Sequence, residues 1–369
     1  MVSPSDPLER LNFTHDGGRL RAAVIGAGYW GPNLARNFKA ADDWDLVGIV
    51  DLDLERALKI AGPLGDVPVF ASLDELLAET DVDAVAIATP ARTHHAVALQ
   101  ALRAGKHVLV EKPLAAGTDL GLDMVETASR SGLTLMADHT YCYTPAAIKI
   151  RELVAEGALG DILFIDSVRI NLGLIQPDVD VFWDLAPHDL SIIDFILPGG
   201  LRPRAVSAQG SDPLGTGKSC VGHLMFDLPN NAMAHINVNW LSPTKIRQMV
   251  IGGSRRTLVW DDLNPQQRIS IYDRGVNFEK AAVTEAQRTA QAISYRLGDT
   301  WSPALAEREA LGLMVAEFAA SIREGRPSRT SGAAGLRVLE VLEAASASVA
   351  AGGQARPTSN VEVQLEGTR

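Results

Sequence analysis

The first 140 residues alternate short apolar runs with segments whose apolar residues recur at helical spacing. The runs are apolar at nearly every position and rich in Val and Ile, which is typical of strands buried on both faces of a parallel sheet. They are AAVI (22–25), LVGIV (46–50), VPVF (67–70), AVAIA (84–88), HVLV (107–110) and LTLMA (133–137). The segments between them predict helices, with Ser72 and Thr93 as N-caps and Gly105 as a stop. This alternation predicts an α/β fold with a doubly wound parallel sheet.

A glycine-rich turn, GAGYWG, directly follows the first run and opens a predicted helix. Gly26 permits a tight turn, Gly28 lets the backbone approach a pyrophosphate, and Gly31 permits close packing of helix on strand. The first N–H groups of the helix then favour bound phosphates. Asp51 ends the second run, where an acid binds the hydroxyls of an adenosine ribose. Together these features indicate a Rossmann dinucleotide-binding unit rather than a turn without a ligand.

The acid at position 51 also bears on the kind of dinucleotide. A carboxylate there accepts hydrogen bonds from ribose hydroxyls but repels a 2′-phosphate, and Asp53 adds a second negative charge. Arg56 lies one helical turn further on and softens that repulsion. The sequence therefore predicts NAD as the cofactor, in preference to NADP.

Composition and charge exclude several classes of partner. The net charge of −11 argues against nucleic acid, whose phosphates require a basic surface. No apolar run reaches the roughly 18 residues that span a bilayer, and residues 1–18 read as a flexible tail without a signal peptide. The two cysteines, Cys142 and Cys220, form no CxxC pattern, which disfavours a metal site and a disulfide framework. We therefore expect a cytoplasmic protein with no nucleic-acid, membrane or metal partner.

The pattern changes after residue 144. A helical segment at 146–160 leads into several strand-like runs separated by turns such as PNN and GGS, which predicts hairpins in an antiparallel sheet. The expected organisation is a tail (1–18), a Rossmann domain (19–144) and an α+β domain (145–369) with a large, mostly antiparallel sheet for substrate binding and oligomerisation.

Two segments within residues 145–369 are predicted to be loops or an arm rather than parts of the sheet. DPLGTGKS (212–219) nearly matches a phosphate loop, but Asp212 replaces its first glycine and a strand-like run follows, so a hairpin loop is predicted. Residues 276–300 are polar and are expected to form a mobile loop or arm.

Several of these short sequences occur together in a known family. They are the GAGYWG turn with Tyr29 and Trp30, Thr89-Pro90 with His94, Glu111-Lys112-Pro113, WDLAPHDLSIIDFIL (183–197) and WSPALAEREAL (301–311). In these residues the chain resembles the glucose-fructose oxidoreductase / inositol dehydrogenase / rhizopine-catabolism (Gfo/Idh/MocA) family of NAD(P)-dependent oxidoreductases. The resemblance covers nearly the whole chain from about residue 20, and the EKP sequence is its most specific part.

The resemblance implies roles for individual residues. Tyr29, Trp30, Thr89, Pro90, His94 and Glu111 correspond to positions at the cofactor. Lys112 would lie between nicotinamide and substrate, and Pro113 would follow a cis peptide bond. Asp184 and His188 match the family's Asp-x-x-x-His, and a histidine there looks more like the inositol and nucleotide-sugar dehydrogenase branches. The family's second sheet typically makes the contacts of a homodimer or homotetramer.

The same roles follow from the chemistry of alcohol oxidation. The reaction needs a base for the hydroxyl proton, and the ordinary histidine pKa of about 6.5 suits His188 for that task. Asp184 lies four residues earlier, so on a helix its carboxylate can orient the imidazole. Lys112 can polarise the reacting oxygen. The plainer alternative is that Asp184 caps a helix and His188 is a solvated residue of its first turn.

Further polar residues are candidates for substrate binding. They are His139, Arg169, Asn171, Lys245 and Arg247, which can bind hydroxyls or an anionic group, or can instead form surface salt bridges or oligomer contacts. The leading hypothesis is an NAD-dependent dehydrogenase for a secondary alcohol of a sugar, with a nucleotide-linked sugar favoured. The alternatives are a free inositol or polyol dehydrogenase, a sugar ketoreductase, and a non-catalytic NAD-dependent sensor.

Overall fold

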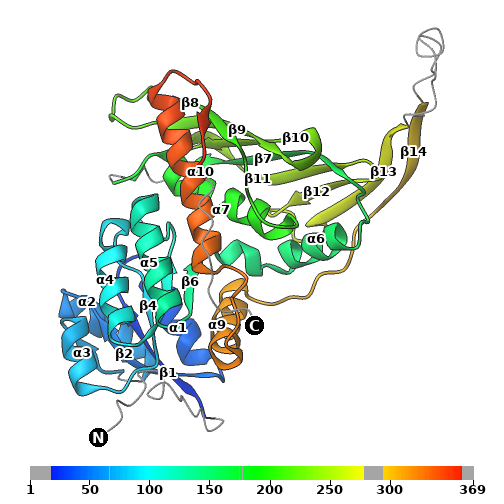
Figure 1. Cartoon of the computed structure of the whole chain (residues 1–369). Coiled ribbons are helices and arrows are strands. Elements are labelled where there is room, and N and C mark those ends of the chain that lie inside the picture. Colours follow the sequence, from blue (N-terminus) through cyan, green and yellow to red (C-terminus); the bar gives the residue numbers. More distant parts are fainter. Residues whose placement is uncertain (1–17, 66, 174, 177, 278–293, 360–369) are drawn as a thin grey trace, which may run out of the picture.

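A computed structural model describes residues 18–65, 67–173, 175–176, 178–277 and 294–359. Two sheets dominate it, one at each end of the molecule, with helices between and around them (Figure 1). Apart from its last residue, the predicted tail 1–18 lies outside the described residues.

The first sheet confirms the predicted parallel architecture. In the described residues it has six strands in the order β3-β2-β1-β4-β5-β6. Their bounds are β1 Leu20–Ile25, β2 Trp44–Val50, β3 Val69–Phe70, β4 Ala84–Ile87, β5 His107–Glu111 and β6 Leu135–Asp138. Each predicted run forms one of these strands because each is covered by helices on both faces. The strand order reverses between β1 and β4, so the crevice outside their carboxyl ends is the place where such sheets bind ligands.

The helices around this sheet begin and end mostly as predicted. They are α1 Gly31–Ala40, α2 Leu54–Ala61, α3 Leu73–Glu79, α4 Ala91–Arg103 and α5 Thr118–Arg130, with a short 3-10 turn at η2 Gly62–Leu64. Ser72 caps α3 by accepting a hydrogen bond from the Glu75 amide, and Gly105 follows α4 with a φ of 74°. The prediction of Thr93 as an N-cap is wrong. Helix α4 starts earlier, after Pro90, and the Thr93 hydroxyl bonds back to the Pro90 carbonyl.

The second sheet is mostly antiparallel, as predicted. Its nine strands in the described residues run β14-β13-β12-β11-β7-β10-β9-β8-β15, and only β10 and β7 pair in parallel. Their bounds are β7 Ile162–Leu172, β8 Ala205–Ser211, β9 Val221–Leu228, β10 Ala232–Asn239, β11 Leu241–Gly253, β12 Thr257–Asp261, β13 Ile269–Asn277, β14 Ser294–Trp301 and β15 Arg356–Pro357. Segment 212–219 joins the antiparallel strands β8 and β9, which confirms a hairpin loop rather than a phosphate loop.

The prediction of a mobile loop or arm over residues 276–300 can be compared with the structure only in part. Residues 276–277 belong to β13 and 294–300 to β14, and the two strands pair in antiparallel register; residues 278–293 lie outside the described residues. This hairpin extends away from the body of the protein (Figure 1). Strands beyond the core bury few side chains, as the exposed Tyr295 and Leu297 show. Polar composition therefore did not distinguish this hairpin from a loop.

The remaining helices connect the two sheets. They are α6 Pro145–Ala155, α7 Val181–Ile196, α9 Ala310–Glu324 and α10 Gly332–Ala350, with short 3-10 turns at η3 Thr140–Tyr143 and η4 Pro229–Asn231. Helix α9 returns to the first sheet, where the buried Trp44 indole donates a 2.9 Å hydrogen bond to the Val315 carbonyl. The same indole packs against Phe38 of α1 and Phe318 of α9, with ring centroids 5.1 and 5.4 Å apart.

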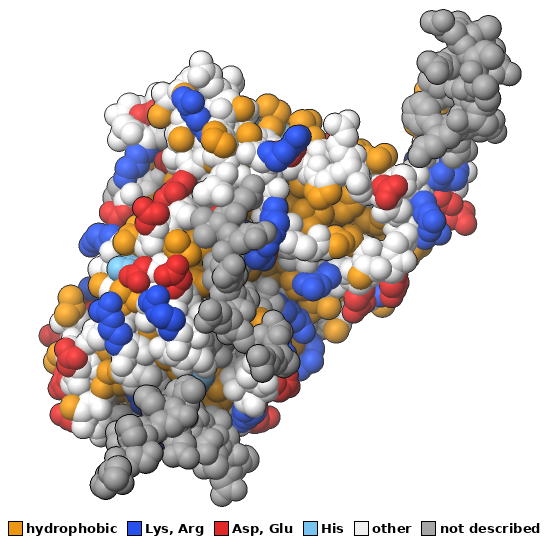
Figure 2. Space-filling model, in the orientation of Figure 1, with side chains coloured by type: hydrophobic (Ala, Val, Ile, Leu, Met, Phe, Trp, Pro, Cys, Tyr) orange, Lys and Arg blue, Asp and Glu red, His pale blue; other side chains and the backbone are white. Residues whose placement is uncertain are grey.

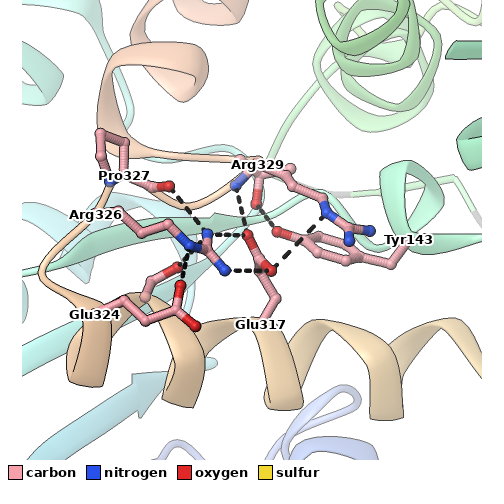
Figure 3. A network of polar contacts seen from close by, with 8 residues as sticks. Tyr143, Glu317, Glu324, Arg326, Pro327 and Arg329 are labelled. Atoms are coloured by element: carbon pink, nitrogen blue, oxygen red, sulfur yellow. Dashed lines mark hydrogen bonds and ion pairs between the residues drawn. The ribbon is translucent and has the colours of Figure 1, made fainter. Parts of the chain in front are cut away.

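A polar network fixes the connection between α9 and α10 against η3 (Figure 3). The Glu317 carboxylate accepts two hydrogen bonds from Arg326, at 2.8 and 3.2 Å, and one from the Arg329 amide. Next to them, Thr330 bonds to the Tyr143 hydroxyl at 3.0 Å and donates to the Ala137 carbonyl. Because η3 follows β6 directly, this network holds the residues that begin one wall of the cavity described below.

We expect Trp44→Ala to lower the free energy of unfolding by about 3–5 kcal/mol, because it removes a buried indole together with its ring packing and its hydrogen bond to the Val315 carbonyl. Urea unfolding followed by circular dichroism measures the change. Leu58→Ala, at a side chain that is 56% exposed, is the matched control and is expected to cost less than about 0.5 kcal/mol. A loss as small as that of the control would show that Trp44 does not join α9 to the first sheet.

Candidate active site

A cavity of about 750 Å³ lies where the carboxyl ends of the first sheet meet α7 and the second sheet. Of the residues predicted from the sequence, its lining includes Tyr29, Trp30, Glu111, Lys112, Asn171, Asp184, His188 and Arg247. His94, His139, Arg169 and Lys245 are not among the described residues that line it. The cavity therefore brings the EKP sequence and the Asp-x-x-x-His sequence together, although about seventy residues separate them in the chain.

The glycine turn next to this cavity has the space that a dinucleotide requires. Gly26 has a φ of 101°, and a Cβ there would lie 2.7 Å from the Ala88 carbonyl group. A Cβ at Gly31 would collide with the Gly26 carbonyl oxygen. A Cβ at Gly28 meets nothing within 4 Å, so the open side of the turn lies there, and no side chain caps the N-terminus of α1. These residues fit a bound pyrophosphate.

Asp51 is held rigidly at the end of β2. Its carboxylate accepts hydrogen bonds from the Ala27 amide at 2.7 Å and the Asp53 amide at 2.8 Å, and the Arg56 guanidinium lies 3.8 Å away. The acid thus ties the glycine turn to β2. It also stands where the dinucleotide fold places the partner of the adenosine ribose.

The Lys112 ammonium joins the two parts of the site. Its Nζ donates to the Asp184 backbone carbonyl at 2.9 Å and to the Asp184 carboxylate at 3.1 Å, and both side chains are mostly buried. The peptide bond before Pro113 is cis, as the family resemblance implied. A lysine bonded in this way is an ammonium at a fixed place in the cavity wall.

The structure pairs Asp184 with Lys112 and Trp240 rather than with His188. The second carboxylate oxygen accepts a 3.0 Å hydrogen bond from the Trp240 indole. The spacing of four residues on α7 did place Asp184 and His188 along one side of the helix, but stronger donors from other elements occupy the carboxylate. Asp184 is also not the helix cap, since Asp180 caps α7 through the amides of Phe182 and Trp183.

His188 is half-buried, with its Nδ1 atom fully buried, and it is neutral near pH 7. Its ring packs edge-on against Tyr141, with centroids 5.0 Å apart, and its Nδ1 has no hydrogen-bond partner among the described residues. Burial, followed by the positive charges of Lys112 and Arg169, lowers the pKa of His188 well below its ordinary value. A neutral imidazole is the form that accepts a proton. The solvated first-turn histidine considered above is therefore excluded.

Two adjacent carboxyl groups end β5 and β6 beside Lys112. Burial and the neighbouring Asp138 raise the pKa of Glu111 well above its ordinary value, and burial also raises the pKa of Asp138. Asp138 accepts hydrogen bonds from the Trp30 indole, at 2.8 Å, and from the Thr140 hydroxyl. The pair thereby fixes Trp30, next to the glycine turn, against β6. The sequence analysis missed Asp138, although it directly follows the last predicted run.

Three predicted cofactor residues, Thr89, Pro90 and His94, lie behind the cavity wall. The buried His94 ring lies within hydrogen-bond distance of the Pro113 carbonyl, at 2.9 Å, and of the Thr89 carbonyl, at 2.7 Å. It therefore ties the loop after β4 to the loop after β5. The Thr89 hydroxyl itself bonds to Thr93 at 2.8 Å, and Pro90 occupies the N-cap position of α4.

Three predicted substrate residues have other surroundings. Arg169 is buried in an ion pair with Asp189, at 2.7 Å, because the alternation of β7 turns it toward α7. Lys245 is exposed on β11. His139 is buried, and neither of its ring nitrogens has a hydrogen-bond partner among the described residues. Burial lowers the pKa of His139 to about 4.

The cavity lining also contains residues that the sequence analysis did not select. They are Tyr141, Trp183, Asp178, Asp262, Arg268 and Arg308. Within the described ranges, no cluster of three or more His, Cys, Asp or Glu side chains is arranged to hold a metal ion. No helix in the same part of the chain has the length and apolar character needed to cross a membrane.

Comparison with known protein families identifies the class of protein to which this fold and this site belong. Residues 20–139 match the NAD-binding Rossmann fold of an oxidoreductase family, and residues 147–259 match the GFO/IDH/MocA C-terminal domain. The chain belongs to the Gfo/Idh/MocA family and is an NAD-binding oxidoreductase.

Individual relatives give a more specific comparison than the family does. The chain is 31% identical over 322 residues to a UDP-N-acetylglucosamine 3-dehydrogenase of Acidithiobacillus ferrooxidans, covering 86% of this chain and 94% of the relative. A crystal structure of that protein superimposes with a TM-score of 0.76 over 90% of this chain and 98% of the other, at 29% identity. GenD2 from gentamicin A biosynthesis, solved in complex with NAD, has the same TM-score at 26% identity, over 92% of this chain and 97% of that one.

The buried His139 predicts a dependence of stability on pH. Its folded pKa of about 4 lies below the unfolded value near 6.5, so the unfolded chain gains this proton first as the pH falls. We expect the wild-type protein to lose about 2 kcal/mol of unfolding free energy through this residue between pH 7.5 and pH 5. In His139→Leu that part of the loss disappears, because no buried imidazole remains to be protonated.

Urea unfolding at the two pH values measures both proteins. His95→Leu, which removes a partly exposed imidazole bonded to Asp123, is the control for losing a histidine elsewhere. An unchanged pH dependence in His139→Leu would contradict the assignment.

Proposed function

We propose that this protein is an NAD-dependent dehydrogenase that oxidises a secondary alcohol of a nucleotide-linked sugar. The observation that carries the proposal is the meeting of Lys112 and His188, from separate parts of the chain, in one cavity beside the glycine turn. The names of the relatives support the substrate class, since UDP-N-acetylglucosamine 3-dehydrogenase and D-glucoside 3-dehydrogenase (30% identical over 54% of this chain, from Escherichia coli) both act on sugars.

Three features support a cofactor site next to the cavity. They are the glycine turn, the uncapped N-terminus of α1 and Asp51. When bound there, NAD accepts the hydride that leaves the carbinol carbon. Tyr29, which is 93% exposed beside the turn, offers an apolar surface for the cofactor to cover. Residues 19–144 thus supply the cofactor site and residues 145–369 the remaining walls of the cavity.

The chain's own residues handle the proton and the charge on oxygen. The Lys112 ammonium donates a hydrogen bond to the reacting oxygen and stabilises the negative charge that develops there. Asp184 keeps that ammonium in position. The neutral His188 imidazole accepts the hydroxyl proton, and the positive charges around it hinder it from taking a proton from water beforehand.

The open face of the second sheet supports assembly into a homodimer or homotetramer. Figure 2 shows hydrophobic side chains exposed along this sheet, and those with large exposed areas include Phe164, Leu172, Met225 and Met233. An apolar sheet face of this kind needs a partner to cover it. The two free, buried cysteines fit a reducing compartment such as the cytoplasm.

Lys112→Met and His188→Asn are each expected to lower turnover at least about 100-fold, the usual scale for a lost acid–base or charge-stabilising group. The affinity for NAD, measured by calorimetry, is expected to remain within about twofold. NADH formation on UDP-N-acetylglucosamine, methyl glucoside and myo-inositol measures turnover. Lys245→Met is the matched control, because that lysine is exposed and lies outside the cavity lining.

Unchanged turnover in both variants would contradict the catalytic assignment. Tight binding of NAD without turnover on any alcohol or ketone would instead favour a sensor.

Asp51→Ser tests the preference for NAD over NADP. Losing the carboxylate removes the hydrogen bonds to the ribose and the repulsion of a 2′-phosphate, so the ratio of kcat/KM for NAD to that for NADP is expected to fall about tenfold or more. Asp53→Ser removes only the second negative charge, at a half-exposed side chain, and is expected to lower the ratio less than Asp51→Ser does. An unaltered ratio in Asp51→Ser would show that another residue selects the cofactor.

A further inference from the structure

Among the described residues, four positively charged side chains line the cavity, and two of them have no partner there. Lys112 is bonded to Asp184, and Arg247 donates to the Tyr141 hydroxyl at 2.7 Å. Arg268 and Arg308 are exposed, and no ion pair or side-chain hydrogen bond joins either of them to any other residue that the structure describes.

The acidic residues of the cavity do not neutralise these two arginines. Asp262 lies 3.9 Å from Arg247, and Asp178 lies 3.5 Å from Arg92. Asp184 is bonded to Lys112, while Glu111 and Asp138 are hydrogen-bonded to each other. Each acid in the described lining therefore already has a partner of its own. Within the part of the chain that the structure describes, two guanidinium groups at the cavity thus have no counter-charge, although the protein as a whole is strongly acidic.

Hydrogen bonds hold the backbone at or next to Arg268 and Arg308, although their side chains have no partner in the described ranges. Arg268 directly precedes β13, and its carbonyl accepts a 2.8 Å hydrogen bond from the Asp261 amide. Arg308 directly precedes Glu309, whose carboxylate is bonded to Arg36 and Asn37 of α1. The two arginines thus come from the second sheet and from the segment that returns to the first, and both reach one cavity.

We infer that Arg268 and Arg308 bind the phosphate groups of the nucleotide-linked substrate. This inference rests on the proposed function and extends it to the residues that select the substrate. A free sugar has only neutral hydroxyls and would leave both guanidinium charges without a counter-charge, whereas a diphosphate offers the bidentate geometry that arginine favours. The Arg247 Nε, which is buried without a hydrogen-bond partner among the described residues, adds a donor in the same wall.

Both NAD and the proposed substrate carry a diphosphate, so the chemistry of the group does not distinguish which of them the two arginines bind. The glycine turn and the N-terminus of α1 already provide for the cofactor's pyrophosphate. Arg268 directly precedes β13 of the second sheet, and Arg308 lies in the segment before α9, so neither residue belongs to that turn or to α1. We therefore assign the two arginines to the substrate, and the experiment below includes a separate measurement with NAD.

The test compares Arg268→Gln, Arg308→Gln and the double variant with the wild-type protein. Calorimetry with UDP, at saturating NAD, measures binding of the diphosphate without any need for turnover. Each single variant is expected to weaken UDP binding about tenfold and the double variant more, the scale of a lost charge-assisted hydrogen bond. The KM for UDP-N-acetylglucosamine is expected to rise in parallel, with unchanged kcat and an unchanged KM for methyl glucoside.

Arg103→Gln, at an exposed arginine on α4 outside the cavity lining, is the matched control and is expected to bind UDP as the wild type does. Equal UDP affinity in the double variant and the wild type would overturn the inference. So would a loss of NAD affinity with UDP affinity retained, because the arginines would then serve the cofactor. No binding of UDP to the wild type would overturn it as well. A different outcome would be that the protein oxidises only free sugars while UDP binding still depends on the arginines. That outcome would contradict only the proposed reaction.

Discussion

The contact between Lys112 and Asp184 is the interaction on which the site depends. Lys112 directly follows β5 of the first sheet, and Asp184 lies in the first turn of α7. Two hydrogen bonds from one ammonium fix the distance between these elements, and the Trp240 indole fixes the carboxylate from the second sheet. A charge this deeply buried is costly without its partner. The same contact therefore closes the cavity and positions its principal cation.

Most of the fold was predictable because buried segments have a recognisable pattern of apolar residues in the sequence. Strands covered on both faces must be apolar at nearly every position, and six runs with that property became the six strands of the first sheet. This pattern does not identify strands that are not buried. The hairpin of β13 and β14 extends beyond the core, so its polar residues resemble those of a loop. At Thr93, a hydroxyl suited to capping lies one turn inside a helix that begins after Pro90.

The candidate site was predictable in its positions but not in its contacts. The resemblance to the family identified Lys112, Asp184 and His188, and the ends of strands and the spacing of four residues are consistent with it. The partners of Asp184 come from strands far along the chain, and no spacing reveals them. Arg169 illustrates the same limit, since one step of strand alternation decides whether a guanidinium faces a cavity or a buried carboxylate.

Trp44 has a consequence for dissecting the protein into parts. The indole belongs to the second strand of the cofactor-binding sheet, yet its N–H and one ring face are covered by α9, which lies some 270 residues later in the chain. A fragment ending near residue 144 would expose that aromatic surface to water and leave a donor unpaired. The nucleotide-binding half is thus continuous in space but not in sequence, and a recombinant version of it would have to retain the C-terminal helices.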